Sequence, residues 1–199
     1  MKKSFMAILA TATLLGSGVA RAAECRYEQN TTDKLSNEIV VITRWDELTH
    51  WLRQIAREIT GHVSAASYGD QKYLRIQIEH ARPSILAPSQ GVLENSIAVP
   101  DGGELLVAME DGTVITLYAD RAVTGHTTFV PPHTGEYDND FYWLTTFATI
   151  QYDLDASALE ALMAQGAKAV RIFTSTGYHD IRIHKRNLGD IQKAIGCIL

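Results

Sequence analysis

The sequence predicts an α+β fold: a largely antiparallel β-sheet built from hairpins, with two or three helices packed on it. Strand-like runs outnumber helical ones, and most of them occur in neighbouring pairs joined by short turns that contain glycine. The chain lacks the regular alternation of strand and helix that indicates a parallel sheet. Together these observations favour hairpins over βαβ units.

Three paired segments predict the hairpins. In the first, Leu74, Ile76 and Ile78 alternate with polar residues, so one face of that strand is expected to be buried and the other wet. In the second, Asp111-Gly112 is the dipeptide that a type I′ turn prefers, because both of its central residues need positive φ. The three pairs are 62–68 with 72–79 around Gly69-Asp70, 105–110 with 113–118 around Asp111-Gly112, and 169–174 with 178–184 around Thr176-Gly177.

Three amphipathic segments predict helices. Apolar residues recur at helical spacing from Trp45 to Ile59, ending near Gly61, although a strand is the alternative for 46–60. Asp155 is expected to cap a second helix that runs to Gln165, with Gly166 as a left-handed C-cap. The third helix follows a cap at Asn187, and its expected inner face carries Leu188, Ile191, Ala194 and Ile195.

The remaining segments are predicted from composition. Residues 38–43 and 141–152 have strand composition, and three stretches are expected to be irregular: 27–37, 83–103 and the long polar loop 121–140.

Residues 1–22 have the features of a cleavable secretory signal peptide. Lys2 and Lys3 precede an apolar run, and Ala20-Arg21-Ala22 fits the small-x-small cleavage rule. The apolar run is about half of the roughly 20 residues that a spanning helix needs, which disfavours an uncleaved anchor. We therefore expect residues 23–199 to form a single periplasmic or secreted bacterial domain, with no membrane span after cleavage.

The charge and the cysteines of the mature chain also indicate its surroundings. Of 18 Lys and Arg residues three lie in the predicted signal, which leaves 15 against 23 Asp and Glu and a net charge of −8. Such a chain lacks the basic surface that nucleic acid or an anionic membrane requires. Its two cysteines, Cys25 and Cys197, are expected to form a disulfide bond in an oxidising compartment.

Residues 125–140 contain the densest group of chemically versatile side chains. His126, His133, Asp138 and Asp140 could ligate a divalent metal through imidazole and carboxylate groups, although a six-residue gap between the histidines matches no strong motif. The alternative is an exposed loop whose polar residues face water. His126 and His133, with Tyr142 from the adjoining aromatic run, are candidate binding residues.

Catalytic motifs are absent from the sequence. It contains no Walker loop, Gly-x-Gly-x-x-Gly turn, His-Glu-x-x-His helix or Gly-x-Ser-x-Gly elbow. His179 and Asp180 are neighbours, but adjacent residues of a strand point to opposite faces, so Asp180 is badly placed to orient the imidazole.

The C-terminal half resembles uncharacterised exported bacterial proteins that share a domain of unknown function. The resemblance covers about half of the mature chain and implies an exported bacterial domain, without an activity or site residues. The residues that carry it are Gly102-Gly103-Glu104-Leu105-Leu106, Asp111-Gly112-Thr113, Tyr152 to Leu162, Val170-Arg171-Ile172 and Thr174-Ser175-Thr176-Gly177-Tyr178.

Three hypotheses of function follow. The first is a non-enzymatic binding protein that takes a protein or glycan partner in the cell envelope. The second is a metal-dependent hydrolase that uses the 125–140 loop. The third is a structural component of the envelope. Export, compact size and the absence of catalytic motifs favour the first.

Overall fold

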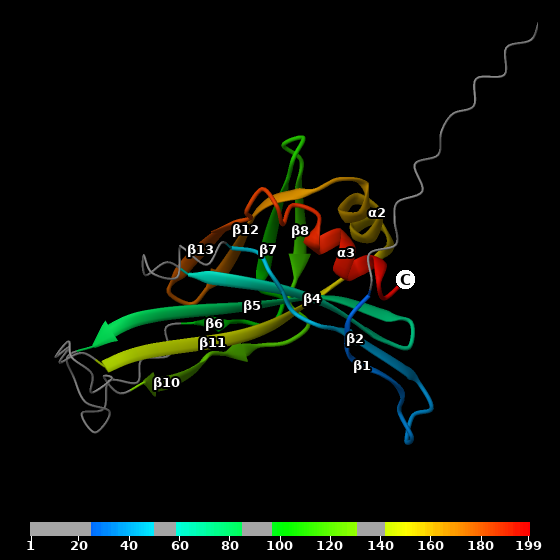
Figure 1. Cartoon of the computed structure of the whole chain (residues 1–199), viewed down its shortest axis with the longest axis horizontal. Helices are drawn as coiled ribbons and strands as arrows, with labels where there is room; N and C mark the ends of the chain where they lie inside the picture. The colour runs from blue at the N-terminus through cyan, green and yellow to red at the C-terminus, as the bar shows by residue number, and fades with distance from the viewer. Residues whose placement is uncertain (1–24, 50–58, 85–96, 131–141) are drawn as a thin grey trace, which may run out of the picture.

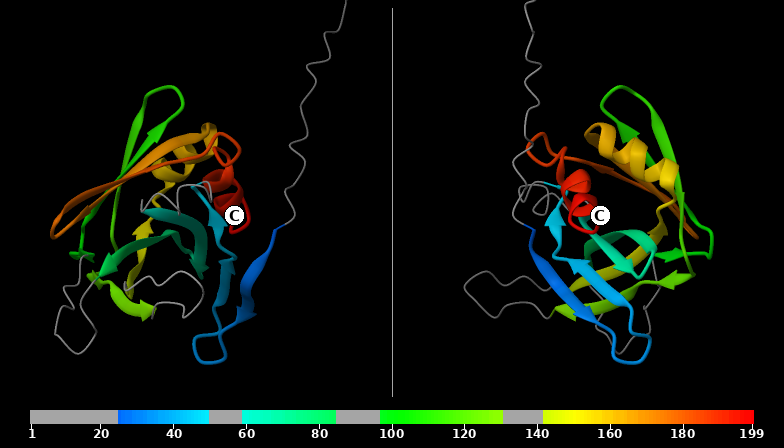
Figure 2. Two further views of the ribbon diagram at one scale, coloured as in Figure 1. Left: turned by 60° about the vertical axis from the view of Figure 1, so that its left-hand side comes forward. Right: turned by 90° about the vertical axis from the view of Figure 1, so that its right-hand side faces the viewer.

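The computed structural model describes residues 25–49, 59–84, 97–130 and 142–199. The predicted signal peptide therefore lies outside the described residues. These residues form two antiparallel sheets that pack against each other, with two helices side by side at one end (Figures 1 and 2). No helix in this part of the chain is long and apolar enough to cross a bilayer.

The larger sheet has seven strands and curls into half of a barrel. Its order is β1-β2-β4-β5-β11-β10, and the short β3 also pairs with β4. The long strands β5 and β11 form its centre and pair from Tyr73–Asp153 to Ser84–Tyr142. Its strands are β1 (Tyr27–Thr32), β2 (Ile39–Thr43), β3 (Asp46–Glu47), β4 (Thr60–Tyr68), β5 (Gln71–Ser84), β10 (His126–Val130) and β11 (Tyr142–Asp153).

The smaller sheet has four strands in the order β13-β12-β7-β8, so β13 and β8 are its edges. A two-stranded ladder, β6 (Ala98–Val99) with β9 (Val123–Thr124), lies apart from both sheets in the pairing. The strands of the smaller sheet are β7 (Glu104–Met109), β8 (Val114–Tyr118), β12 (Ala167–Thr174) and β13 (Gly177–Arg182).

The two sheets share one hydrophobic core. Leu74, Ile76 and Ile78 are fully buried, as their alternation predicts, and belong to the same cluster as the inner residues of the smaller sheet. The sheets approach so closely that a Cβ at Gly61 of β4 would lie 2.8 Å from the Cδ1 atom of Ile181 in β13. Only glycine fits this contact without displacement of a neighbour.

The two described helices are short. Helix α2 (Ala156–Ala164) begins at the predicted cap, where the Asp155 carboxylate accepts a hydrogen bond from the Ala158 amide at 2.7 Å. Helix α3 (Asp190–Gly196) buries Ile191, Ala194 and Ile195 as predicted, but its N-cap is Gly189. Asn187 instead donates a hydrogen bond from its side chain to the Glu47 carbonyl.

The predicted α+β class is wrong. The described residues are mostly β, with 56% of them in strands and 12% in helix. The strands are antiparallel, but the two sheets cover each other, whereas the helices occupy only one end of the molecule (Figure 2). Residues 27–32 and 126–130 form strands β1 and β10 where irregular chain was expected. Strand β5 continues through residues 80–84, beyond the predicted end of that strand at 79 and into the stretch 83–103 that was expected to be irregular.

The helix predicted from Trp45 to near Gly61 is wrong at both described ends, where the structure has the strands that were the alternative. Asp46 and Glu47 pair with Val63 and His62 as strand β3, and Thr60 already belongs to β4. The middle of this prediction, residues 50–58, lies outside the described residues. Pairing with β4 prevails here over the local helical pattern.

All three predicted hairpins are present, but two details of their surroundings differ. Of Asp111 and Gly112 only the glycine has a positive φ (94°), so the turn is not type I′. Gly166 is not left-handed either. A Cβ at Gly166 would lie 3.1 Å from the Leu188 carbonyl oxygen, a tight contact with backbone, and 2.6 Å from a carboxylate oxygen of the flexible Glu110 side chain.

The predicted disulfide bond is confirmed. Cys25 and Cys197 are joined across a sequence separation of 172, with 5.6 Å between their Cα atoms. A disulfide of this kind indicates an oxidising, non-cytoplasmic location.

Candidate functional site

Among the residues that the structure describes, strand β8 has a neighbouring strand on only one side. In the described part of the chain it pairs with β7, and nothing pairs with its other edge from Val114 to Thr116. The exposed edge of a sheet is a template for another strand, and natural proteins usually protect it with charged residues or proline. Strand β8 reads Val-Ile-Thr-Leu-Tyr and contains neither.

The hydrogen bonds at the two ends of β8 show which backbone groups face the open edge. Met109 donates to the Thr113 carbonyl at 2.8 Å, and Ala119 donates to the Gly103 carbonyl at 2.9 Å. Because bonded residues alternate along an antiparallel strand, the odd-numbered residues of β8 bond to β7. Val114 and Thr116 therefore turn their N–H and C=O groups outward.

The open edge ends near Tyr118. The bridge between Ala119 and Tyr152, together with a bond from the Asp120 amide to the Gln151 carbonyl at 3.0 Å, fastens the chain to β11 there. The outward groups thus consist of those of Val114 and Thr116 together with the Tyr118 amide. This edge is long enough to pair with a short extended segment.

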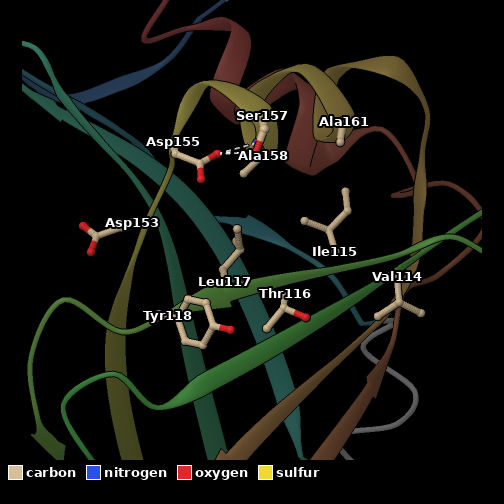
Figure 3. Close-up of a pocket in the computed structure, with 10 residues that line it drawn as sticks. All are labelled: Val114, Ile115, Thr116, Leu117, Tyr118, Asp153, Asp155, Ser157, Ala158 and Ala161. Atoms are coloured by element: carbon tan, nitrogen blue, oxygen red, sulfur yellow. Dashed lines mark hydrogen bonds between the residues drawn. The ribbon is translucent and has the colours of Figure 1, made fainter.

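A groove of about 480 Å³ separates β8 from α2 (Figure 3). The strand and the helix run in opposite directions, so Val114 lies at the same end as Ala161, and Tyr118 at the same end as Asp155. All five residues of β8 line the groove, and the side chains of Ile115 and Leu117 are the ones that point toward the helix. The helix contributes small side chains, Ser157, Ala158 and Ala161, which leave space that larger residues would fill.

The Tyr118 end of the groove is acidic. Asp153 and Asp155 line it, and Asp153 is exposed with no ion pair in the described chain. Hydrogen bonds to the Asp155 carboxylate, first from the Ala158 amide, hold the pKa of Asp155 below its usual value, so it is charged at neutral pH. This end of the groove therefore favours positive charge.

The pKa of Asp120, which lies beside this end of the groove, is shifted in the opposite direction from that of Asp155. Burial raises the pKa of its carboxyl, and the nearby Asp153 adds to the effect, although Arg121 opposes both from 3.8 Å. Arg121 is the counter-charge that the structure shows here, and its side chain is 66% exposed.

The outer face of the smaller sheet adjoins the open edge and carries large exposed side chains. Val114 and Tyr118 of β8 are 55% and 52% exposed, and Tyr178 of β13 is 57% exposed. Arg171 stacks over the Tyr178 ring at 4.1 Å and donates two hydrogen bonds to Asp180, at 2.6 and 2.8 Å. This face and the groove are the two sides of the same edge.

The sequence-predicted site is only partly described. His126 lies exposed in β10, opposite Phe147 of β11. His133, Asp138 and Asp140 lie outside the described residues, as does the side chain of Tyr142, whose backbone begins β11. Within the described ranges no three His, Cys, Asp or Glu side chains lie close enough to hold a metal ion. The metal-site prediction thus stays a prediction.

The arrangement of His179 agrees with the alternation argument. Asp180 faces outward to Arg171, whereas the His179 ring lies 6.4 Å from the His80 ring of β5, between centroids. Burial, and to a lesser degree His80, lowers the pKa of His179. His179 and Asp180 therefore face away from each other and do not form a catalytic pair.

The groove was missed by the sequence analysis. The absence of charge and proline from residues 114–118 was a visible signal, but its meaning depends on which strand of the sheet lies at the edge. Comparisons of the chain with protein-family models, curated proteins and solved structures give no match.

Proposed function

We propose that this protein is an exported, non-enzymatic binding protein, periplasmic or secreted, that captures an extended segment of a partner protein along β8. The open β8 edge beside a helix-lined groove carries the proposal. In strand addition, backbone hydrogen bonds supply affinity, and pockets for alternate side chains supply specificity. Strand β8 offers the first and the groove offers the second.

Export supports the choice of compartment. The disulfide bond indicates an oxidising location, and the predicted signal peptide in residues 1–22 agrees with delivery to the periplasm or beyond.

A substitution that blocks only the outer edge tests the proposal. Thr116→Pro removes an outward N–H and leaves the β7 ladder intact, since proline is tolerated on the free side of an edge strand. Wild-type protein is expected to enrich binders from a phage-displayed library of random heptapeptides. Thr116→Pro should weaken the binding of these peptides at least about tenfold. A tenfold loss corresponds to about 1.4 kcal/mol, which is the contribution of one backbone hydrogen bond between uncharged groups.

Thr116→Ala is the matched control because it changes the same side chain and keeps the amide. Circular dichroism and urea unfolding should show that both variants fold. Failure of the wild type to enrich any peptide, or equal binding of the peptides to Thr116→Pro and wild type, would overturn the proposal.

A further inference from the structure

The two sides of a strand added to β8 would meet different surfaces. Residues directly opposite each other in a sheet place their side chains on the same face. Side chains opposite Val114, Thr116 and Tyr118 would therefore lie on the outer face, and those between them would point into the groove beside Ile115 and Leu117. Both faces of a bound segment would therefore contact the protein and contribute to specificity.

From this arrangement we propose that the segment captured by β8 is a basic, alternating strand. It runs antiparallel to β8, with small side chains toward α2, large apolar ones on the outer face, and Lys or Arg in its N-terminal part. This inference rests on the proposed function and names the chemistry of the partner.

The groove sets the size of the inward side chains. Its volume of about 480 Å³ must hold the backbone of the added strand as well as its inward residues. Ala158 is buried and Ala161 is half-buried. Because each carries only a methyl group, neither has a flexible side chain that could move aside. Small residues fit this space.

The outer face sets the size of the outward side chains. Val114 and Tyr118 flank Thr116 there, and both are more than half exposed. Large apolar residues opposite them would cover these side chains, as aromatic and β-branched pairs do across strands.

The acidic end sets the charge and its position along the segment. Asp153 and Asp155 lie at the Tyr118 end, which is where the N-terminal part of an antiparallel segment would begin. The whole chain has a net charge of −5, and −8 without the predicted signal peptide, so a basic partner is favoured at long range as well.

The same charges disfavour a second copy of this chain as the occupant. Two antiparallel β8 strands would bring Asp153 of one copy toward the turn of the other, where Glu110 and Asp111 lie. Like charges would then face each other at both ends of the paired strands.

Selection of peptides by two versions of the protein tests the charge. Wild-type protein should enrich Lys or Arg in the N-terminal third of library peptides, and Asp153→Lys should enrich Asp or Glu there. Acetylated synthetic peptides that differ only in Lys or Glu at that position should differ about tenfold in affinity for wild type at low salt, and this preference should reverse for Asp153→Lys. The difference should shrink as salt is added.

A second pair of variants tests the size of the groove. Ala161→Leu fills space between α2 and β8 and should weaken peptide binding about tenfold, roughly the effect of one lost small-residue contact. Ala164→Leu is the matched control, because Ala164 is exposed one turn nearer the end of the same helix and does not line the groove. Equal binding by these two variants would contradict the inward-side prediction.

The outcomes separate this inference from the proposed function. Peptides that bind wild type and lose binding to Thr116→Pro, yet show no base preference and no reversal with Asp153→Lys, would overturn the inference and leave strand addition standing. Self-association of wild type in sedimentation, abolished by Thr116→Pro, would identify a second copy as the occupant and would also overturn it.

Discussion

The charged carboxylate of Asp190 lowers the stability of the fold. Asp190 begins α3 and is half-buried near Asp46, whose carboxylate already accepts hydrogen bonds from Lys193 and Arg26, both at 2.9 Å. Burial, and then the charge of Asp46, raises the pKa of Asp190 to about 6, while Lys193 acts in the other direction. Folding therefore favours the protonated acid.

The stability of the protein should depend on pH through this residue. The pKa of Asp190 rises from 3.8 in the unfolded chain to about 6 in the folded protein. Its protonation therefore stabilises the fold fully below pH 3.8, and this stabilisation is lost as the pH rises through 6. Asp190→Asn should therefore raise the free energy of unfolding at pH 7.5 by about 1 kcal/mol, after allowance for solvent screening. Urea unfolding at pH 7.5 and pH 4 measures the effect, and an equal gain at both pH values would contradict it.

At the scale of the element, the cap of α2 also supports the groove. The Asp155 carboxylate accepts hydrogen bonds from the Ala158 amide and from the Ser157 hydroxyl at 2.8 Å. Both partners line the groove, so the cap positions the helix wall.

Removal of the cap should loosen the first turn of α2. Asp155→Ala leaves the Ala158 amide without its acceptor, so amide hydrogen exchange at Ala158 should accelerate, with little change in β5. Asp155→Asn keeps an acceptor and is the control. The pKa of Asp155 is lowered by folding, so the cap is complete above 3.8 and should be lost as pH falls through the lower folded value. Unchanged exchange in Asp155→Ala would show that the cap does not hold this turn.

The hairpins could be predicted from sequence because their signals are local. Gly69, which has φ of 58°, lies in a two-residue loop between residues that pair directly, Tyr68 and Gln71. The β1 strand gave no such signal because all of its residues after Tyr27 are exposed, so it has no apolar alternation. Strand β10 was read as loop because Gly125 and Pro131 flank it. Gly125 is needed for contact instead, since a Cβ there would lie 2.9 Å from the Ile97 carbonyl.

At the scale of the whole molecule, the curling of the larger sheet and the edge position of β8 were beyond reach from sequence. Both depend on contacts between residues far apart in the chain, such as Gly61 with Ile181. The hydrophobic pattern of residues 114–118 predicts a strand wherever it is placed in a sheet. Only the order β13-β12-β7-β8 shows that no strand of the described residues pairs with its far side.

The disulfide should contribute a large share of the global stability. In the chain-entropy model a closed loop of this length stabilises the fold by up to about 5 kcal/mol. The double variant Cys25→Ser with Cys197→Ser should therefore lose several kcal/mol in urea unfolding, and dithiothreitol should reduce the stability of wild type but not of the variant. Equal stability of oxidised wild type and the double variant would show that the bond adds nothing to folding.

The same bond determines how the protein would carry mechanical load. Cys25 and Cys197 bracket nearly all of the described residues, and their Cα atoms lie 5.6 Å apart. A pulling force applied to the chain before Cys25 and after Cys197 would pass through the disulfide bond, and both sheets would remain outside the line of tension. A captured partner at β8 would then feel none of the force transmitted between the termini.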